Sequence, residues 1–127
     1  VTGPAEFTRM VQLWIYAPSY YEDPERVAVL EDKQRAMPDR PVPQHTYEAQ
    51  AEACATHVTL DDLPRISAPT LITVGEQDIF TPLAYSRAIH QRVCGSELVV
   101  FPRCGHVHHW EDLARFNQTV LDFLGKH

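Results

Sequence analysis

The chain has 127 residues, of which 44% are hydrophobic and 22% charged, and its length and composition suit one globular domain. The formal net charge is −6 and the eleven basic residues are scattered, which argues against nucleic acid or an anionic membrane surface as a partner. No apolar run approaches the roughly 20 residues of a membrane-spanning helix.

The first 59 residues are predicted to be mostly helical. Apolar residues recur at helical spacing from Ala5 to Tyr16, and Asp23-Pro24 is a helix start signal, with aspartate at the cap and proline in the first position. That second helix should end before Pro38, where three prolines in six residues predict an extended loop. A third helix is predicted from Gln44 to His57. The residues expected to form its packing face are Tyr47, Ala51, Cys54 and Ala55.

A strand–helix–strand unit is predicted next. A capped short helix near Leu60 leads into Thr70 to Val74, a β-branched apolar run that predicts a buried strand. Thr81-Pro82 opens a helix to Val93, with threonine suited to the cap and proline to the first helical position. Glu97 to Phe101 predicts a second strand. This order implies two parallel strands and an α/β fold class.

The last helix is predicted to begin near Trp110 and to end at Gly125. Glu111 and Asp112 are expected in its first turn, where acidic side chains favour the positive end of the helix dipole. Its apolar residues recur with helical periodicity and predict an amphipathic stripe. The residues of this stripe are Leu113, Phe116, Val120, Leu121 and Leu124.

One acid and one histidine follow the two predicted strands. Asp78 lies in the loop after the first strand, and His106 lies in the loop after the second. Open α/β sheets place their sites at this edge, so both side chains are candidates for a functional site. Taken alone, Asp78 could be a turn residue and His106 an ordinary loop histidine, because short motifs also occur by chance.

The pattern Ala-Pro-Thr-Leu…Gly-Glu-Gln-Asp-Ile-Phe-Thr-Pro, followed by Cys-Gly-His and Trp-Glu…Phe-Asn…Phe-Leu, resembles the C-terminal half of an α/β-hydrolase-fold enzyme. In particular it resembles the enol-lactonase and meta-cleavage-product hydrolase branches. The resemblance is clear from about Leu60 to Leu124. It implies that residues 60–127 form a βαβα part of the hydrolase core, with two parallel strands, and that residues 1–59 form a helical cap-like segment.

The resemblance also implies an activity. Asp78 would be the acid and His106 the base of a Ser-His-Asp triad. The parent enzyme would cleave an ester, an enol-lactone or an activated C–C bond in a small organic substrate, without a cofactor. In this fold the nucleophile comes first in the chain, and the acid and the histidine follow in the order seen here.

Serine catalysis also needs a nucleophile and donors to the oxyanion, which this sequence does not supply. The nucleophile of this fold sits on a Gly-x-Ser-x-Gly turn, and no such motif occurs. The serines are Ser19, Ser67, Ser86 and Ser96. We therefore expect a C-terminal portion of a larger hydrolase, produced by truncation, by proteolysis or as one piece of a divided enzyme, and inactive alone.

Four apolar residues are candidates for a substrate-binding wall, although core packing would explain them equally well. They are Ile79, Phe80, Val107 and Trp14. His108 and His109 form a cluster with His106, but the spacing matches no zinc pattern and we expect no metal. The three cysteines are odd in number and lack metal-ligand spacing, which favours a reducing, cytoplasmic compartment.

Two parallel strands alone would leave sheet edges and apolar surface uncovered. We therefore expect the chain to pair with a missing N-terminal half or to self-associate as an oligomer through its exposed sheet. The alternative to an enzyme is a non-catalytic, self-associating interaction module derived from the same fold, in which Asp78 and His106 are relics. A third interpretation is a small metal-binding protein that uses the histidine cluster.

Overall fold

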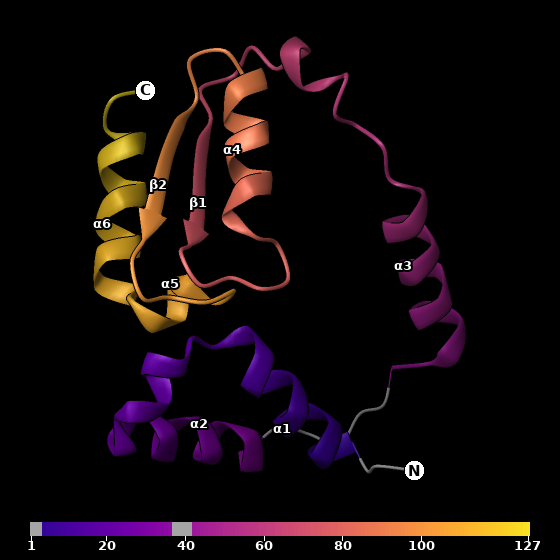
Figure 1. The fold of residues 1–127 in the computed structure, drawn as a ribbon, viewed down its shortest axis with the longest axis vertical. Coiled ribbons are helices and arrows are strands. Elements are labelled where there is room, and N and C mark those ends of the chain that lie inside the picture. Colours follow the sequence, from indigo (N-terminus) through magenta and orange to yellow (C-terminus); the bar gives the residue numbers. More distant parts are fainter. Residues whose placement is uncertain (1–3, 37–41) are drawn as a thin grey trace.

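The computed structural model describes residues 4–36 and 42–127, which form a small α/β unit with helices beyond one end of its strands (Figure 1). None of the helices in these two ranges combines the length and the apolar character that a membrane crossing needs. Two short 3-10 turns cover Pro18–Glu22 and Leu63–Arg65. The main elements are α1 (Pro4–Ile15), α2 (Pro24–Ala36), α3 (Gln44–Thr56), β1 (Leu71–Gly75), α4 (Leu83–Arg92), β2 (Glu97–Phe101), α5 (His108–Glu111) and α6 (Leu113–Leu124).

The two strands pair in parallel, which confirms the predicted α/β class and its strand–helix–strand unit. Their register runs from Leu71 opposite Glu97 to Gly75 opposite Phe101. Helix α4 packs against both strands, and α6 lies beside β2 (Figure 1). The core is small and centres on Phe101, which is 0% exposed, and on the buried Val74 and Val93. Because both strands end at the same edge, the loops that follow them start side by side.

The helical segment before the sheet follows the predicted pattern in part. Asp23 caps α2 as predicted, since its Oδ1 accepts the backbone N–H groups of Glu25 and Arg26. In Figure 1, α1 and α2 lie beyond the C-terminal ends of the strands, next to α5. The ammonium group of Lys33 in α2 lies 4.6 Å from the ring centre of Trp110 in α5. Of the extended loop predicted over residues 38–43, residues 38–41 lie outside the described residues, and Val42 and Pro43 are outside any helix or strand, as predicted.

The predicted packing face of α3 is wrong. Helix α3 has no buried residue, and Tyr47 is 66% exposed. The other three residues of that face, Ala51, Cys54 and Ala55, are exposed as well. In Figure 1 this helix stands apart from the strands. Its alanine-rich and glutamine-rich composition favours helix formation without providing a broad apolar stripe, so the helix buries little.

The start of α4 and the course of the last helix also differ from the prediction. Thr81 does not cap α4; its hydroxyl donates to Asp78 instead. The predicted helix from Trp110 is two helices, and Asp112 lies between them, where its carboxylate caps α6 by accepting the N–H of Arg115. The amphipathic stripe of α6 is only partly covered. Three of its residues remain 49% or more exposed, namely Leu113, Leu121 and Leu124.

Three backbone segments meet where the strands end, and we call this place the glycine junction. It consists of Gly75 at the end of β1, Gly105 in the loop after β2, and the segment of residues 15–17, which begins with the last residue of α1. A Cβ atom on Gly75 would collide with the carbonyl of Gly105, and one on Gly105 would lie 2.7 Å from the nitrogen of Ala17. The segments approach this closely only because neither glycine has a side chain.

Gly105→Ala is expected to lower the free energy of unfolding by about 1–3 kcal/mol, because backbone atoms must move apart to admit the methyl group. The measurement is urea unfolding of the purified chain, followed by circular dichroism. Gly125→Ala is the matched control, since its Cβ would meet the carbonyl oxygens of Leu121 at 3.3 Å and Asp122 at 3.8 Å, with no closer contact. An unfolding midpoint for Gly105→Ala equal to that of the control would contradict the tight junction.

Candidate active site

Asp78 and His106 are hydrogen-bonded to each other at the C-terminal edge of the two strands. The distance between His106 Nδ1 and Asp78 Oδ2 is 2.9 Å. The carboxylate side chain is 3% exposed and the imidazole 40% exposed. The pair therefore consists of a buried acid beneath a histidine that solvent and small molecules can reach.

The loop after β1 arranges its own backbone around Asp78. Asp78 Oδ1 accepts the backbone N–H groups of Phe80 and Thr81, both at 2.9 Å, and Oδ2 accepts the Thr81 hydroxyl at 2.7 Å. Burial alone would raise the pKa of Asp78. The hydrogen bonds from Thr81, His106 and Phe80 outweigh burial and hold that pKa below its ordinary value. The carboxylate is therefore ionised at neutral pH.

This geometry determines which imidazole nitrogen can act as a base. An ionised carboxylate only accepts hydrogen bonds, so Nδ1 of His106 must carry a proton to bond Asp78. In the neutral imidazole Nε2 is then unprotonated and able to take a proton from another group. The arrangement thus provides a general base with its tautomer held by a buried acid.

One predicted wall residue, Phe80, lies next to His106, and a second, Trp14, lies next to Phe80. The ring centre of Phe80 is 5.4 Å from that of His106, and the ring of Trp14 in α1 is 6.3 Å from Phe80. Both aromatic side chains are about half exposed, at 45% and 50%. Val107 is half-buried, and its backbone N–H donates to the carbonyl of Ile15. The structure therefore places aromatic surface, from a helix and a loop far apart in sequence, beside the histidine.

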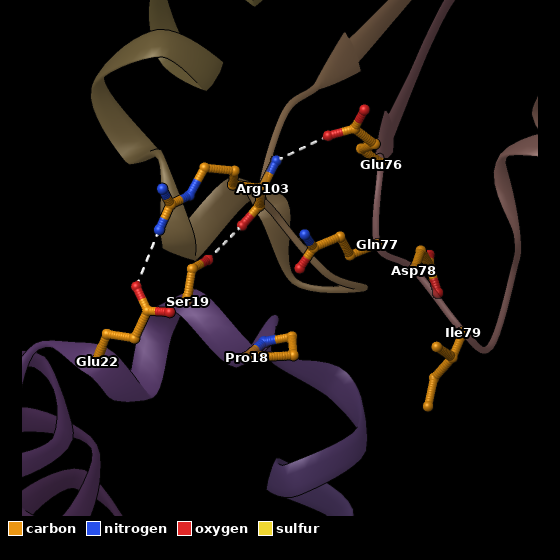
Figure 2. A pocket seen from close by; sticks show the side chains of 8 residues that line it. All are labelled: Pro18, Ser19, Glu22, Glu76, Gln77, Asp78, Ile79 and Arg103. Atoms are coloured by element: carbon orange, nitrogen blue, oxygen red, sulfur yellow. Dashed lines mark hydrogen bonds and ion pairs between the residues drawn. The ribbon is translucent and has the colours of Figure 1, made fainter.

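Ile79, the fourth predicted wall residue, is 64% exposed and lines an open hollow of about 730 Å³ with Asp78 (Figure 2). The opposite wall of the hollow is polar. There, Ser19 donates its hydroxyl to the carbonyl of Arg103 at 2.8 Å, and the guanidinium of Arg103 pairs with Glu22 at 2.9 Å. Figure 2 shows Ser19 directed at Arg103 and away from Asp78.

No nucleophile is evident next to His106 in the described part of the chain. Within residues 4–36 and 42–127, no serine hydroxyl is hydrogen-bonded to His106. Ser96 is bonded to His90 and to the carbonyl of Val93. Cys104 lies buried beneath the histidine loop. Burial, followed by the nearby charge of Glu111, raises the pKa of its thiol to about 11, so the nucleophilic thiolate is scarce at neutral pH.

Glu111 is a site residue that the sequence reasoning missed. The sequence predicts it in the first turn of the last helix, whereas it ends α5, is 7% exposed and accepts the N–H groups of Gly105 at 2.7 Å and Ala17 at 3.1 Å. Burial raises its pKa, although those two N–H groups act in the opposite direction. The only signal in the sequence was an acidic residue directly after Trp110, in a run that is mostly aromatic.

His108, the middle histidine of the cluster, lies against β1. His108 is buried, and its Nε2 lies 3.0 Å from the Thr73 hydroxyl. Burial, followed by the nearby His109, lowers the pKa of His108 and favours its neutral form. Among the described residues, no group of three or more His, Cys, Asp or Glu side chains is arranged to hold a metal ion.

The family whose sequence pattern matches this chain is the Alpha/beta hydrolase family, over residues 2–119. In sequence, the chain is similar to a 2-hydroxy-6-oxononadienedioate/2-hydroxy-6-oxononatrienedioate hydrolase of Klebsiella pneumoniae, at 44% identity over 64 residues, which are 50% of this chain and 22% of that protein. It is also similar to a proline iminopeptidase of Thermoplasma volcanium, at 42% identity over 66 residues, which are 52% of this chain and 22% of that protein.

Among solved structures, the enol-lactonase of Burkholderia xenovorans is similar with a TM-score of 0.78 and 23% identity, over 94% of this chain and 44% of that one. A meta-cleavage product hydrolase is similar with a TM-score of 0.70 and 24% identity, over 100% of this chain and 48% of that one. At these identities the likeness shows the fold alone. The chain spans less than half the length of these structures. The family resemblance seen in the sequence is confirmed.

Thr81→Val is expected to raise the pKa of Asp78 toward its ordinary value of 3.8, because the hydroxyl that stabilises the ionised carboxylate is lost. Stability at pH 7 should fall by about 1 kcal/mol. A folded-state pKa below the unfolded one contributes stability at neutral pH that is lost as pH falls through it. The acid limb of the stability profile should therefore become shallower.

The measurement is a carbon-13 NMR titration of the Asp78 carboxyl together with urea unfolding at several pH values. Thr70→Val is the control, since the Thr70 hydroxyl donates to the carbonyl of Ala68, outside the Asp78 loop. An unchanged Asp78 pKa in Thr81→Val would show that the hydroxyl does not support the carboxylate.

Proposed function

Because the chain belongs to the alpha/beta hydrolase family, we propose that Asp78 and His106 are the acid and the base of a Ser-His-Asp hydrolase. The observation that carries this proposal is the 2.9 Å contact between His106 Nδ1 and a buried Asp78 carboxylate that is held ionised by its own loop. Both residues also follow neighbouring parallel strands, at the edge where α/β folds place their sites.

In this proposal His106 Nε2 takes the proton of a serine hydroxyl as the serine attacks the substrate, and returns that proton to the leaving group. The same nitrogen later activates the water that releases the product. Asp78 keeps the proton on Nδ1 and stabilises the imidazolium that forms in each step. No cofactor is required for these steps.

The proposal places the nucleophile outside these 127 residues. The support is that none of the four serines lies in a Gly-x-Ser-x-Gly motif. We propose that residues 60–127 correspond to the C-terminal βαβα part of the hydrolase core and residues 1–59 to a cap-like segment. The chain alone would then hold an acid and a base with nothing to activate, and would be inactive.

The proposed substrate is a small organic molecule with an ester, a lactone or an activated C–C bond. Support comes from the Klebsiella pneumoniae relative, which is a hydrolase of a dienedioate, and from the aromatic surface beside His106. The Thermoplasma volcanium relative is a peptidase, so the bond that is cleaved differs among similar proteins. We assign the substrate wall to Phe80 and Trp14, with Ile79 and Val107 at its margin.

The three free thiols favour a cytoplasmic location.

The uncovered surface of this chain favours a second candidate, a non-catalytic module that self-associates. Beyond the pairing of β1 with β2, the described residues add no further strand, so each strand has an open edge. Exposed apolar side chains also gather on α1, where Phe7, Met10 and Leu13 are 42–64% exposed. The same surfaces would equally suit docking of the missing part of a hydrolase, so the two candidates differ in what binds there.

The 127-residue chain alone is expected to hydrolyse p-nitrophenyl acetate no faster than its His106→Asn variant, because a base without a nucleophile leaves no covalent route. The measurement is the release of p-nitrophenolate at equal concentrations of the two proteins. His109→Asn is the matched control for the loss of one imidazole. Turnover that depends on His106 in the isolated chain would contradict the absence of a nucleophile.

The positive test co-expresses the chain with a segment of a related hydrolase that carries the Gly-x-Ser-x-Gly turn, and treats the purified mixture with a fluorophosphonate probe. The hydrolase proposal expects both polypeptides to elute together and the serine to be labelled. Labelling should drop by at least about 100-fold in His106→Asn and persist in His109→Asn. Self-association of the chain without co-elution would favour the non-catalytic module.

A further inference from the structure

Glu111 ends α5 with a buried carboxylate that joins two segments far apart in sequence. Its Oε1 accepts the N–H of Gly105 at 2.7 Å, and its Oε2 accepts the N–H of Ala17 at 3.1 Å, across 94 residues of chain. Within residues 4–36 and 42–127 it forms no direct ion pair, although the charge of Arg26 acts to lower its pKa. A buried carboxylate that has no ion-pair partner is tolerable only where N–H groups satisfy its oxygens. These two backbone donors therefore account for its position.

The two contacts hold the backbone on one side of His106, and a third contact holds the other side. Gly105 directly precedes His106 and donates its N–H to Glu111. Val107 directly follows and donates its N–H to the carbonyl of Ile15 at 3.2 Å. Both neighbours of His106 are thus connected to the 15–17 segment by hydrogen bonds, Val107 directly and Gly105 through the Glu111 carboxylate.

We infer that Glu111 is a positioning residue for His106. By holding Gly105 and Ala17 together, its carboxylate fixes the backbone from which the imidazole reaches Asp78. Ala17 lies two residues after the end of α1. The same contact therefore also fixes the position of α1, which carries Trp14 of the aromatic wall. The inference rests on the proposed function, in which His106 must keep Nδ1 on Asp78 and leave Nε2 free.

The inference requires a carboxylate and not only a polar side chain of the same size. Both atoms that approach Glu111 are N–H donors, so both of its terminal atoms must be acceptors. In Glu111→Gln one oxygen becomes an NH₂ group, which cannot accept a hydrogen bond and faces a donor. Either the Gly105 or the Ala17 contact is then lost, although the shape of the side chain is kept.

The test uses the 127-residue chain and measures the tautomer of His106 by long-range proton–nitrogen NMR of the imidazole at a pH where the ring is neutral. The wild-type chain is expected to carry the proton on Nδ1. In Glu111→Gln the ratio of the Nδ1–H to the Nε2–H tautomer should fall roughly tenfold, the scale of one hydrogen bond to a charged acceptor. Amide exchange at Gly105 should accelerate as well.

Asp112→Asn is the matched control. It removes one negative charge at the adjacent position, and asparagine can still accept the N–H of Arg115 that Asp112 accepts. The His106 tautomer should stay unchanged in this variant. Glu111→Asp keeps the charge with a shorter reach, and is expected to lie between the wild type and Glu111→Gln.

Two results would overturn the inference. In the first, Glu111→Gln accelerates Gly105 exchange and leaves the His106 tautomer as in the wild type, which would make Glu111 a structural contact only. In the second, Glu111→Gln and Glu111→Asp both unfold while Asp112→Asn folds, which would assign Glu111 to the stability of the whole chain. A wild-type His106 without a proton on Nδ1 would instead contradict the proposed function itself.

Discussion

The close approach of three backbones at the glycine junction is the constraint on which the rest of this structure depends. Gly75 and Gly105 have no Cβ, so the end of β1, the histidine loop and the 15–17 segment can pack backbone against backbone. The N–H of Gln77 donates to the carbonyl of Cys104 across the same place, at 2.8 Å. Backbone contacts alone therefore hold the loops after the two strands together. As a result Asp78 and His106 lie at a short, fixed distance from each other.

Two buried carboxylates flank the histidine loop, and their environments push their pKa values in opposite directions. Burial would raise the pKa of Asp78, but donors from Thr81, His106 and Phe80 lower it. Burial dominates at Glu111, whose two N–H donors only offset it in part. The two residues therefore change the stability of the chain with pH in opposite directions. Asp78 contributes stability that is lost as pH falls below its ordinary value, whereas Glu111 contributes less as pH rises from its ordinary value through its raised pKa. The surroundings of Asp78 suit a carboxylate that stays ionised. The surroundings of Glu111 disfavour its charge, and the buried carboxylate is kept because it joins two segments of the chain.

Local patterns in the sequence were sufficient for the strand–helix–strand unit and for placing Asp78 and His106 at the same edge of the sheet, because parallel strands end at one edge. The expectation that the two side chains act as a pair came from the family resemblance and not from these patterns. The features that the sequence did not reveal depend on tertiary contacts. Tyr47 is exposed on α3, which stands apart from the strands in Figure 1, and the burial of Glu111 depends on Ala17, 94 residues away. Thr81 had the chemistry of a helix cap, and the nearby Asp78 carboxylate took its hydroxyl instead.

The strands that present the acid and the histidine are consecutive in the chain as well as paired in space. The pair and the carboxylate that secures the histidine loop are therefore encoded in one uninterrupted stretch, from β1 to Glu111. A genetic exchange with both breakpoints outside residues 71–111 would transfer Asp78, His106 and Glu111 together. The new host would have to supply a segment equivalent to residues 15–17, which offers the N–H of Ala17 to Glu111 and the carbonyl of Ile15 to Val107. Recombination could thus move this stretch as one unit without separating Asp78, His106 and Glu111.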